Sequence, residues 1–217
     1  MQFGIKKSPT INFIHGWGMS PRFWHKLQGE LDAFQSTTTD LNFTSEPANK
    51  NPTSPSADFL ITHSLGGLWA LKNGIYPRRG MVFINSFHNF TTFSDKHILQ
   101  AMQKALKDNP HAQMQRFLKQ ADCESQAHQT DFWNTQRLHE GLDWLQRWDG
   151  QIELASLNCP VLVLTGDKDR ICKIDKMMPH WDGHTLITNP DAGHALPLSH
   201  PQWCKKQIKA WIKDNNL

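Results

Sequence analysis

The segment that most constrains this chain is residues 61–67, which read Ile-Thr-His-Ser-Leu-Gly-Gly and follow the apolar residues Phe59 and Leu60. A strand that passes through a small-x-Ser-x-Gly turn into a helix lifts the serine hydroxyl off the end of a sheet, where a substrate and a base both reach it. Ser64 is the serine of such a turn. The other interpretation is that Ser64 caps a helix ahead of a tightly packed glycine turn, and the run by itself leaves both open.

Two further loops carry groups that could act together with Ser64. Near the N-terminus, the strand-like run 11–14 leads into the loop 15–18, His-Gly-Trp-Gly, which can point a backbone N–H at a developing oxyanion. Near the C-terminus, the run 185–188 leads into a loop that ends at His194. Taken singly, the first loop is a common tight turn and the histidine is a solvated loop residue.

A carboxylate is available in the turn that follows the apolar run 160–165. Asp167 and Asp169 both lie in this turn, and residue types and spacing alone do not choose between them. Asp191 is nearer to His194 in the sequence, but its neighbours are typical of a turn. The chain order is therefore serine, aspartate and histidine, each just after an expected strand, and this order in this context predicts a catalytic triad.

Strand-like and helix-like patterns alternate along the chain, which predicts an α/β fold with a mainly parallel sheet flanked by helices. Further strands are expected at 37–41 and 80–85. A helix is expected from Ser20-Pro21 to Phe34, because apolar residues recur there at steps of three and four. A last helix is expected to open at 199–201.

These motifs resemble those of the α/β-hydrolase superfamily over nearly the whole chain. Within it, the chain is most similar to the pimeloyl-[acyl-carrier protein] methyl ester esterases of biotin synthesis. The resemblance implies the α/β-hydrolase fold and a serine carboxylesterase that hydrolyses the methyl ester of a pimeloyl chain on acyl carrier protein, with no metal and no organic cofactor. The segments that carry it are His15–Ser20, Phe23-Trp24, Ser64–Leu68, Gly141–Leu145 and Cys159–Ile171.

The resemblance also assigns roles to individual residues. It selects Asp169 as the acid, because family members place the acid three residues after the glycine at the strand end. In the mechanism that it implies, Ser64 attacks the ester, His194 takes and returns the proton, and Asp169 orients the imidazole. The backbone N–H groups of Trp17 and Leu65 are expected to hold the oxyanion.

Residues 88–150 have helical patterns and no clear strand, and they interrupt a hydrolase core formed by 1–87 and 151–217. In hydrolases of this kind such an insertion is a helical cap, or lid, that shapes the acyl pocket and excludes water. Alternatively, the tryptophans of this segment only hold its helices together. The candidate pocket residues are His15, Trp133 and Trp144.

A basic stretch lies within the insertion, since residues 96–119 hold five Lys and Arg side chains against the single acid Asp108. A basic helical face near the substrate entrance could steer an acidic carrier protein. A solvated helix face gives the same pattern. The candidate carrier-binding residues are Lys104, Lys107, Arg116 and Lys119.

Length and composition argue against several other classes of protein. The 217 residues suffice for one α/β domain with a modest insertion. No apolar run is long enough to span a membrane, and the N-terminus has no signal-peptide pattern. A net charge of +3 is far from that of a nucleic-acid-binding protein. The 4 scattered cysteines are typical of free thiols in a reducing cytoplasm, where we expect a monomer.

Three features depart from the family pattern. Thr62 stands where the elbow usually has glycine, and its β-branched side chain is expected to strain the turn. His63 precedes the serine, where biotin esterases often have Trp. The connection 41–58 is short and rich in Asn, Pro, Ser and Thr, so the usual crossover helix is expected to be trimmed or missing. Two alternatives therefore stay open: a general short-chain carboxylesterase, thioesterase or lactonase, and a non-catalytic binding protein of the same fold.

Overall fold

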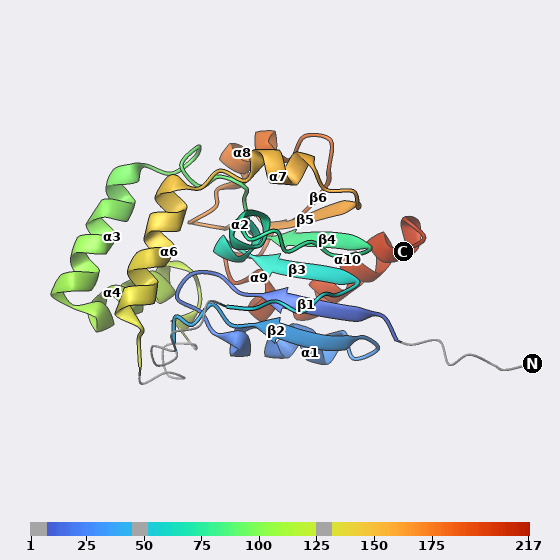
Figure 1. Ribbon diagram of the computed structural model, residues 1–217, viewed down its shortest axis with the longest axis horizontal. Coiled ribbons are helices and arrows are strands. Elements are labelled where there is room, and N and C mark those ends of the chain that lie inside the picture. The colour runs from blue at the N-terminus through green and yellow to red at the C-terminus, as the bar shows by residue number, and fades with distance from the viewer. Residues whose placement is uncertain (1–7, 45–51, 125–131) are drawn as a thin grey trace, which may run out of the picture.

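A parallel sheet of six strands forms the centre of the molecule (Figure 1). The computed structural model describes residues 8–44, 52–124 and 132–217. The strand order is β2-β1-β3-β4-β5-β6, and each neighbouring pair is parallel, which confirms the α/β fold expected from the sequence. The strands are β1 (Thr10–Ile14), β2 (Gln35–Thr39), β3 (Phe59–His63), β4 (Gly80–Ile84), β5 (Val161–Gly166) and β6 (Thr185–Asn189).

The strands end nearly level with one another at one edge of the sheet. His63 pairs with Ile84, and Gly166 pairs with Asn189, so the loops that follow these strands meet at this edge. Every residue of β3, β4 and β5 is buried. This complete burial is typical of parallel strands that are covered by helices on both faces.

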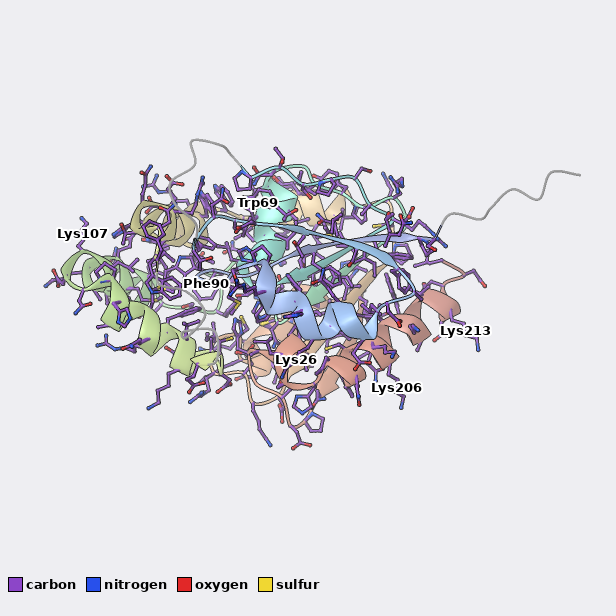
Figure 2. The ribbon with its side chains drawn as sticks, turned by 90° about the horizontal axis from the view of Figure 1, so that it is seen from below. Lys26, Trp69, Phe90, Lys107, Lys206 and Lys213 are labelled. Carbon is purple, nitrogen blue, oxygen red and sulfur yellow. The ribbon has the colours of Figure 1, made fainter. Side chains whose placement is uncertain are left out.

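Helices cover both faces of the sheet. On one face, α2 (Leu65–Lys72) packs beside α7 (Gln151–Ala155). On the other face, α1 (His25–Glu30), α9 (Leu196–Ser199) and α10 (Pro201–Asp214) pack together. Figure 2 shows Trp69 of α2 across the sheet from Lys26 of α1 and Lys206 of α10. Three short helical segments complete the core: η1 (Pro21–Trp24), α8 (Ile174–Met177) and η2 (Met178–Trp181).

The longer helices of the predicted insertion lie beyond the carboxyl ends of the strands (Figure 1). They are α3 (Lys96–Asp108), α4 (Pro110–Gln120) and α6 (Thr135–Arg147). The two ends of the insertion adjoin, because the backbone N–H of Gly150 donates to the carbonyl oxygen of His88 at 2.8 Å. Leu138, Leu142 and Leu145 are buried on one face of α6, as their spacing predicts.

Two elements differ from the sequence-based expectation. The helix expected to reach Phe34 ends at Glu30, because the chain must turn back there to begin β2 at Gln35. The strand expected at 37–41 correspondingly begins and ends two residues earlier. Within the connection 41–58, the described parts 41–44 and 52–58 hold no helix. Residues 45–51 of that connection, and the N-terminal residues 1–7 on which the signal-peptide prediction rests, lie outside the described residues.

The four cysteines are all free thiols, and three of them are buried. None of the helices in the described part of the chain combines the length and the hydropathy that a membrane crossing requires.

Candidate active site

Ser64 lies in the tight turn between β3 and α2, where its backbone adopts φ 51° and ψ −126°. A non-glycine residue takes such a conformation only at a cost of about 1–3 kcal/mol. The turn packs so closely that a Cβ atom on Gly66 would lie 2.5 Å from the carbonyl oxygen of Ile14, and one on Gly67 would lie 2.2 Å from Oγ of Ser86. This strand–turn–helix geometry is that of a nucleophile elbow.

Thr62 is accommodated in the regular part of the strand before this turn. It pairs with Ile14 and Phe83 on the neighbouring strands, and its buried hydroxyl donates to the carbonyl oxygen of Val82 at 3.2 Å. Ser64, and not Thr62, has the positive φ angle. The backbone strain that the sequence places at Thr62 is therefore located at Ser64.

His194 connects Ser64 to Asp169. Its Nε2 atom lies 3.1 Å from Oγ of Ser64, and its Nδ1 atom lies 2.8 Å from Oδ2 of Asp169. Both partners of the second contact have side chains that are fully buried. The three residues lie in the loops that follow β3, β5 and β6. Because these strands end at the same edge of the sheet, Ser64 and His194 meet although they are 130 positions apart in the chain.

Only one of the candidate carboxylates reaches the imidazole. The second oxygen of Asp169, Oδ1, accepts the backbone N–H groups of Ile171 at 2.7 Å and Cys172 at 2.8 Å, which fixes the carboxylate and leaves Oδ2 for His194. Asp167 is exposed. Asp191 is exposed as well and forms an ion pair with Lys168 at 2.9 Å.

The loop after β1 lies directly against the elbow. A Cβ atom on Gly16 would lie 2.9 Å from Cβ of Ser64. The carbonyl oxygen of Gly16 accepts hydrogen bonds from Nδ1 of His15 at 3.0 Å and from the N–H of Met19 at 3.3 Å. Because the peptide bond is planar and trans, fixing this carbonyl also fixes the opposite direction of the Trp17 N–H. The N–H of Leu65 belongs to the first turn of α2, whose donors have no partner within the helix.

A cavity of about 110 Å³ opens at Ser64. Its walls are mainly apolar and come from both the core and the insertion, and Figure 2 shows Phe90 between these two parts. The polar side chains of the lining, apart from Ser64, are Ser94, Gln120 and Arg170. The apolar lining residues are Trp17, Phe87, Phe90, Ile98, Leu99, Met102, Phe117, Leu145 and Ile171.

The three residues that the sequence suggested for the pocket are not among the described residues that line this cavity. His15 is fully buried beneath the loop, where its Nε2 atom accepts the N–H of Leu41 at 3.1 Å. Trp144 stacks on Trp148 with ring centroids 5.0 Å apart, so it joins α6 to the segment after it. Trp133 is partly buried against the core. The apolar part of the wall comes instead from phenylalanines, aliphatic residues and Trp17.

The basic candidates all lie exposed on α3 and α4. Arg116 lines a surface groove that shares Ile98, Met102 and Phe117 with the cavity at Ser64. Lys107 lies at the outer end of α3, away from Phe90 (Figure 2). The structure therefore brings one of the four candidates, Arg116, to a surface that is continuous with the cavity, whereas Lys104, Lys107 and Lys119 do not line either hollow.

One group of potential metal ligands occurs among the described residues, and it overlaps the triad. The donor atoms of Asp169, Cys172 and His194 all lie within 4.8 Å of one another. Two of these residues are already hydrogen-bonded to each other. Burial and the neighbouring Asp169 carboxylate raise the pKa of the Cys172 thiol well above its ordinary value, which disfavours the thiolate that a metal needs. The arrangement fits proton transfer better than metal ligation.

Two residues at the end of β4 support the site and were not identified from the sequence as functional. Asn85 donates from Nδ2 to the carbonyl oxygens of Gly193 and His194, and Ser86 donates from Oγ to the carbonyl oxygen of Ser64 at 2.6 Å. Their position in the sequence could have identified them, because ligands and reacting groups gather outside the carboxyl ends of parallel strands. Polar residues that directly follow an apolar strand are candidates for this reason.

The sequence of this chain is similar to those of known proteins. A family model described as the alpha/beta hydrolase family matches residues 32–206. The pimeloyl-[acyl-carrier protein] methyl ester esterase of Wigglesworthia glossinidia brevipalpis is 28% identical over 96% of this chain and 95% of its own length. The enzyme of the same name from Shewanella oneidensis is 25% identical over 96% of this chain and 92% of its own length.

Solved structures share the fold. A bromoperoxidase from Bacillus anthracis superposes with a TM-score of 0.78, over 95% of this chain and 92% of that protein. Its sequence identity to this chain is 14%, so this likeness concerns the fold alone.

Proposed function

The chain belongs to the α/β-hydrolase family, and from this premise we propose that it is a serine carboxylesterase that acts through an acyl-enzyme. The observation that carries the proposal is the unbroken line of contacts from Ser64 through His194 to Asp169. A buried imidazole held between a hydroxyl and a carboxylate is the arrangement that activates a serine nucleophile. The names of the two curated relatives support ester hydrolysis.

The proposed reaction has two halves. In the first, His194 takes the proton of Ser64 as its oxygen attacks the ester carbonyl, and Asp169 stabilises the resulting imidazolium. The tetrahedral oxyanion lies between the N–H groups of Trp17 and Leu65, where each donor is worth about 100- to 1,000-fold in rate. When the intermediate collapses, His194 returns the proton to the departing alcohol. In the second half, water loses a proton to His194 and attacks the acyl-enzyme, which releases the acid and restores Ser64.

The substrate that we propose is the methyl ester of a pimeloyl chain on acyl carrier protein, with methanol as the leaving alcohol. The apolar wall formed by Phe87, Phe90 and Leu99 suits the methylene groups of such a chain. We propose residues 88–150 as the cap that completes this wall and keeps water out. The relatives named for this substrate match over nearly their whole length, which supports the assignment.

We propose that the carrier protein approaches over α3 and α4. Arg116 lines the groove that adjoins the cavity, and Lys104, Lys107 and Lys119 are exposed on the same pair of helices. Positive side chains around an entrance accelerate the encounter with an acidic partner, and salt weakens this effect. The Arg116→Glu substitution is therefore expected to raise KM for the carrier-bound ester and to leave KM for a small ester unchanged.

Methanol release from pimeloyl-acyl carrier protein methyl ester tests the proposal, with wild type compared with Ser64→Ala and with p-nitrophenyl butyrate as a second substrate. Turnover of the carrier-bound ester that is lost in the variant is the expected result. Turnover of the nitrophenyl ester alone would retain the serine esterase and reject the carrier-bound substrate, in favour of a general short-chain esterase. No turnover of either ester would favour a binding protein that uses this fold without catalysis.

A further inference from the structure

We infer that His63 and Asn85 are positioning residues that clamp the backbone carbonyl of His194 and so hold its imidazole in line with Ser64. This inference rests on the proposed function, since it concerns the same histidine. It assigns a role to the residue directly before the serine, and to the residue directly after β4.

The first half of the clamp is His63. Its Nε2 atom lies 2.9 Å from the carbonyl oxygen of His194. A carbonyl oxygen only accepts hydrogen bonds, so Nε2 must carry the proton and Nδ1 is the unprotonated nitrogen. Nδ1 is buried without a partner among the described residues and faces the loop after β1, where a Cβ atom on Gly16 would lie 2.9 Å from it. The tautomer of His63 is therefore set by the carbonyl that it holds.

The ring of His63 is itself held in place. It lies against Phe23, with ring centroids 4.4 Å apart and planes inclined by 33°, and against the ring of His194, with centroids 4.8 Å apart. Its side chain is fully buried. A rigid, buried donor of this kind fixes its acceptor more closely than a mobile surface side chain does, because its own rotamer is locked by packing.

The second half of the clamp is Asn85. Its Nδ2 atom donates to the carbonyl oxygen of His194 at 2.8 Å and to that of Gly193 at 2.9 Å. Its Oδ1 atom accepts the N–H of Gly166, at the end of β5, at 2.9 Å. One side chain thus ties the strand that leads to Asp169 to the loop that carries His194. The backbone of Asn85 has φ 44°, a left-handed conformation that asparagine tolerates better than most residues do.

The hydrogen bonds of His63 and Asn85 to the carbonyl oxygen of His194 are important because the side chain of His194 transfers the proton in the proposed reaction. The loop 190–195 joins β6 to α9 and contains no regular secondary structure of its own. Without the clamp, the backbone of His194 could shift while the fold stayed intact. A displacement of about 1 Å in a reacting group costs on the order of 100-fold in rate.

The test compares four substitutions in the full chain, two at His63, one at Asn85 and one control. His63→Phe removes the donor and keeps an aromatic ring against Phe23, whereas His63→Gln keeps an amide N–H near the position of Nε2. The matched control is Asn12→Ala. It removes a buried side chain from β1 that donates to Thr39 and Ser54 and accepts from Thr37, and these partners lie outside the loop of His194. Thermal unfolding of each variant measures the loss of stability separately from the loss of rate.

Each variant is characterised by kcat and KM for p-nitrophenyl butyrate, by the pH profile of kcat/KM, and by the rate of covalent labelling by a fluorophosphonate. We expect His63→Phe to lower kcat and the labelling rate by about 10- to 100-fold with KM nearly unchanged, and to shift the acid limb of the pH profile. His63→Gln should recover most of this loss. Asn85→Asp, which keeps the acceptor for Gly166 and loses the donor, should lower kcat in the same way.

Unchanged kcat and labelling in His63→Phe would overturn the inference and leave the proposed esterase standing. An equal loss of kcat in Asn12→Ala, at equal loss of stability, would assign the effect to general destabilisation and would also overturn it. A wild-type protein that neither hydrolyses the ester nor reacts with the fluorophosphonate would contradict the proposed function and this inference together.

Discussion

The imidazole of His194 lies 2.8 Å from one oxygen of Asp169, and the other oxygen of that carboxylate accepts two backbone N–H groups. This contact distinguishes two aspartates that stand two positions apart in the same turn. The backbone N–H of Asp167 donates to Asn189, and its side chain is exposed. A buried carboxylate with both oxygens engaged can fix the tautomer of the histidine that it contacts.

Asp169→Asn should therefore reduce kcat by about 10,000-fold, because an amide in place of the carboxylate favours the wrong tautomer of His194. Asp167→Asn is the matched control, since it makes the same chemical change in the same turn, and we expect it to keep kcat within about twofold of wild type. Steady-state hydrolysis of p-nitrophenyl butyrate measures both. A larger loss in the Asp167 variant would reassign the acid.

The buried His63 should make the fold sensitive to acid. Burial, with the nearby His194, holds its pKa well below the ordinary value of 6.5. The unfolded chain therefore takes up a proton that the folded chain does not, and stability falls as pH drops below about 6.5. Between pH 7.5 and 5.5 the unfolding free energy of wild type should therefore decrease, because the unfolded chain binds this proton and the folded chain does not. His63→Gln should remove that part of the pH dependence in urea titrations; identical slopes for both proteins would contradict the assignment.

Gly66 and Gly29 should respond oppositely to alanine. A Cβ atom on Gly66 would lie 2.5 Å and 2.7 Å from the carbonyl oxygens of Ile14 and His15, so the elbow must open. Gly66→Ala should cost about 1–3 kcal/mol of stability and most of the activity. Nothing lies within 4 Å of the same atom on Gly29, on α1, and alanine should stabilise that helix by about 0.5–1 kcal/mol. Melting curves measure both, and a stable, active Gly66→Ala would refute the close packing of the elbow.

The cavity wall should select acyl length. Met102 lines both the cavity at Ser64 and the outer groove, so a larger side chain there shortens the space for the acyl chain. Met102→Trp should lower kcat/KM for p-nitrophenyl octanoate about 10-fold or more and leave the acetate ester nearly unchanged. The acetate reaction in the same variant is the control, because a general defect would lower both. Equal losses of kcat/KM for the octanoate and acetate esters would show that the acyl chain does not bind beside Met102.

Much of the fold was predictable because its signals are local. The apolar runs at 11–14, 80–85 and 160–165 each become a buried parallel strand, since such strands need hydrophobic residues on both faces. The prediction of a helix as far as Phe34 was wrong at its end. The spacing of apolar residues continues past Glu30, whereas the chain must turn there to begin β2. Short elements such as α8 and η2 carry too few residues for a periodic signal.

The candidate site likewise has some residues that the local sequence predicts and others that it does not. Ser64 and His194 follow from motif and order, but the choice of Asp169 over Asp167 needed either the family resemblance or the contact itself. The sequence-based prediction places the pocket at His15, Trp133 and Trp144, whereas the cavity is lined by Phe87, Phe90 and other residues that only the tertiary packing brings to Ser64. The clamp of His63 and Asn85 depends on a contact between residues far apart in the sequence, which no local pattern encodes.

The most direct test of the account is to map the residue that a fluorophosphonate modifies. The wild-type protein is treated with one equivalent, digested, and analysed by mass spectrometry, with Ser64→Ala and Asp169→Asn treated in parallel. We predict a single modification on Ser64, no labelling of the Ser64 variant, and slow labelling of the Asp169 variant. Ester hydrolysis that persists in Ser64→Ala, or labelling at another serine, would contradict the central claim that Ser64 is the nucleophile.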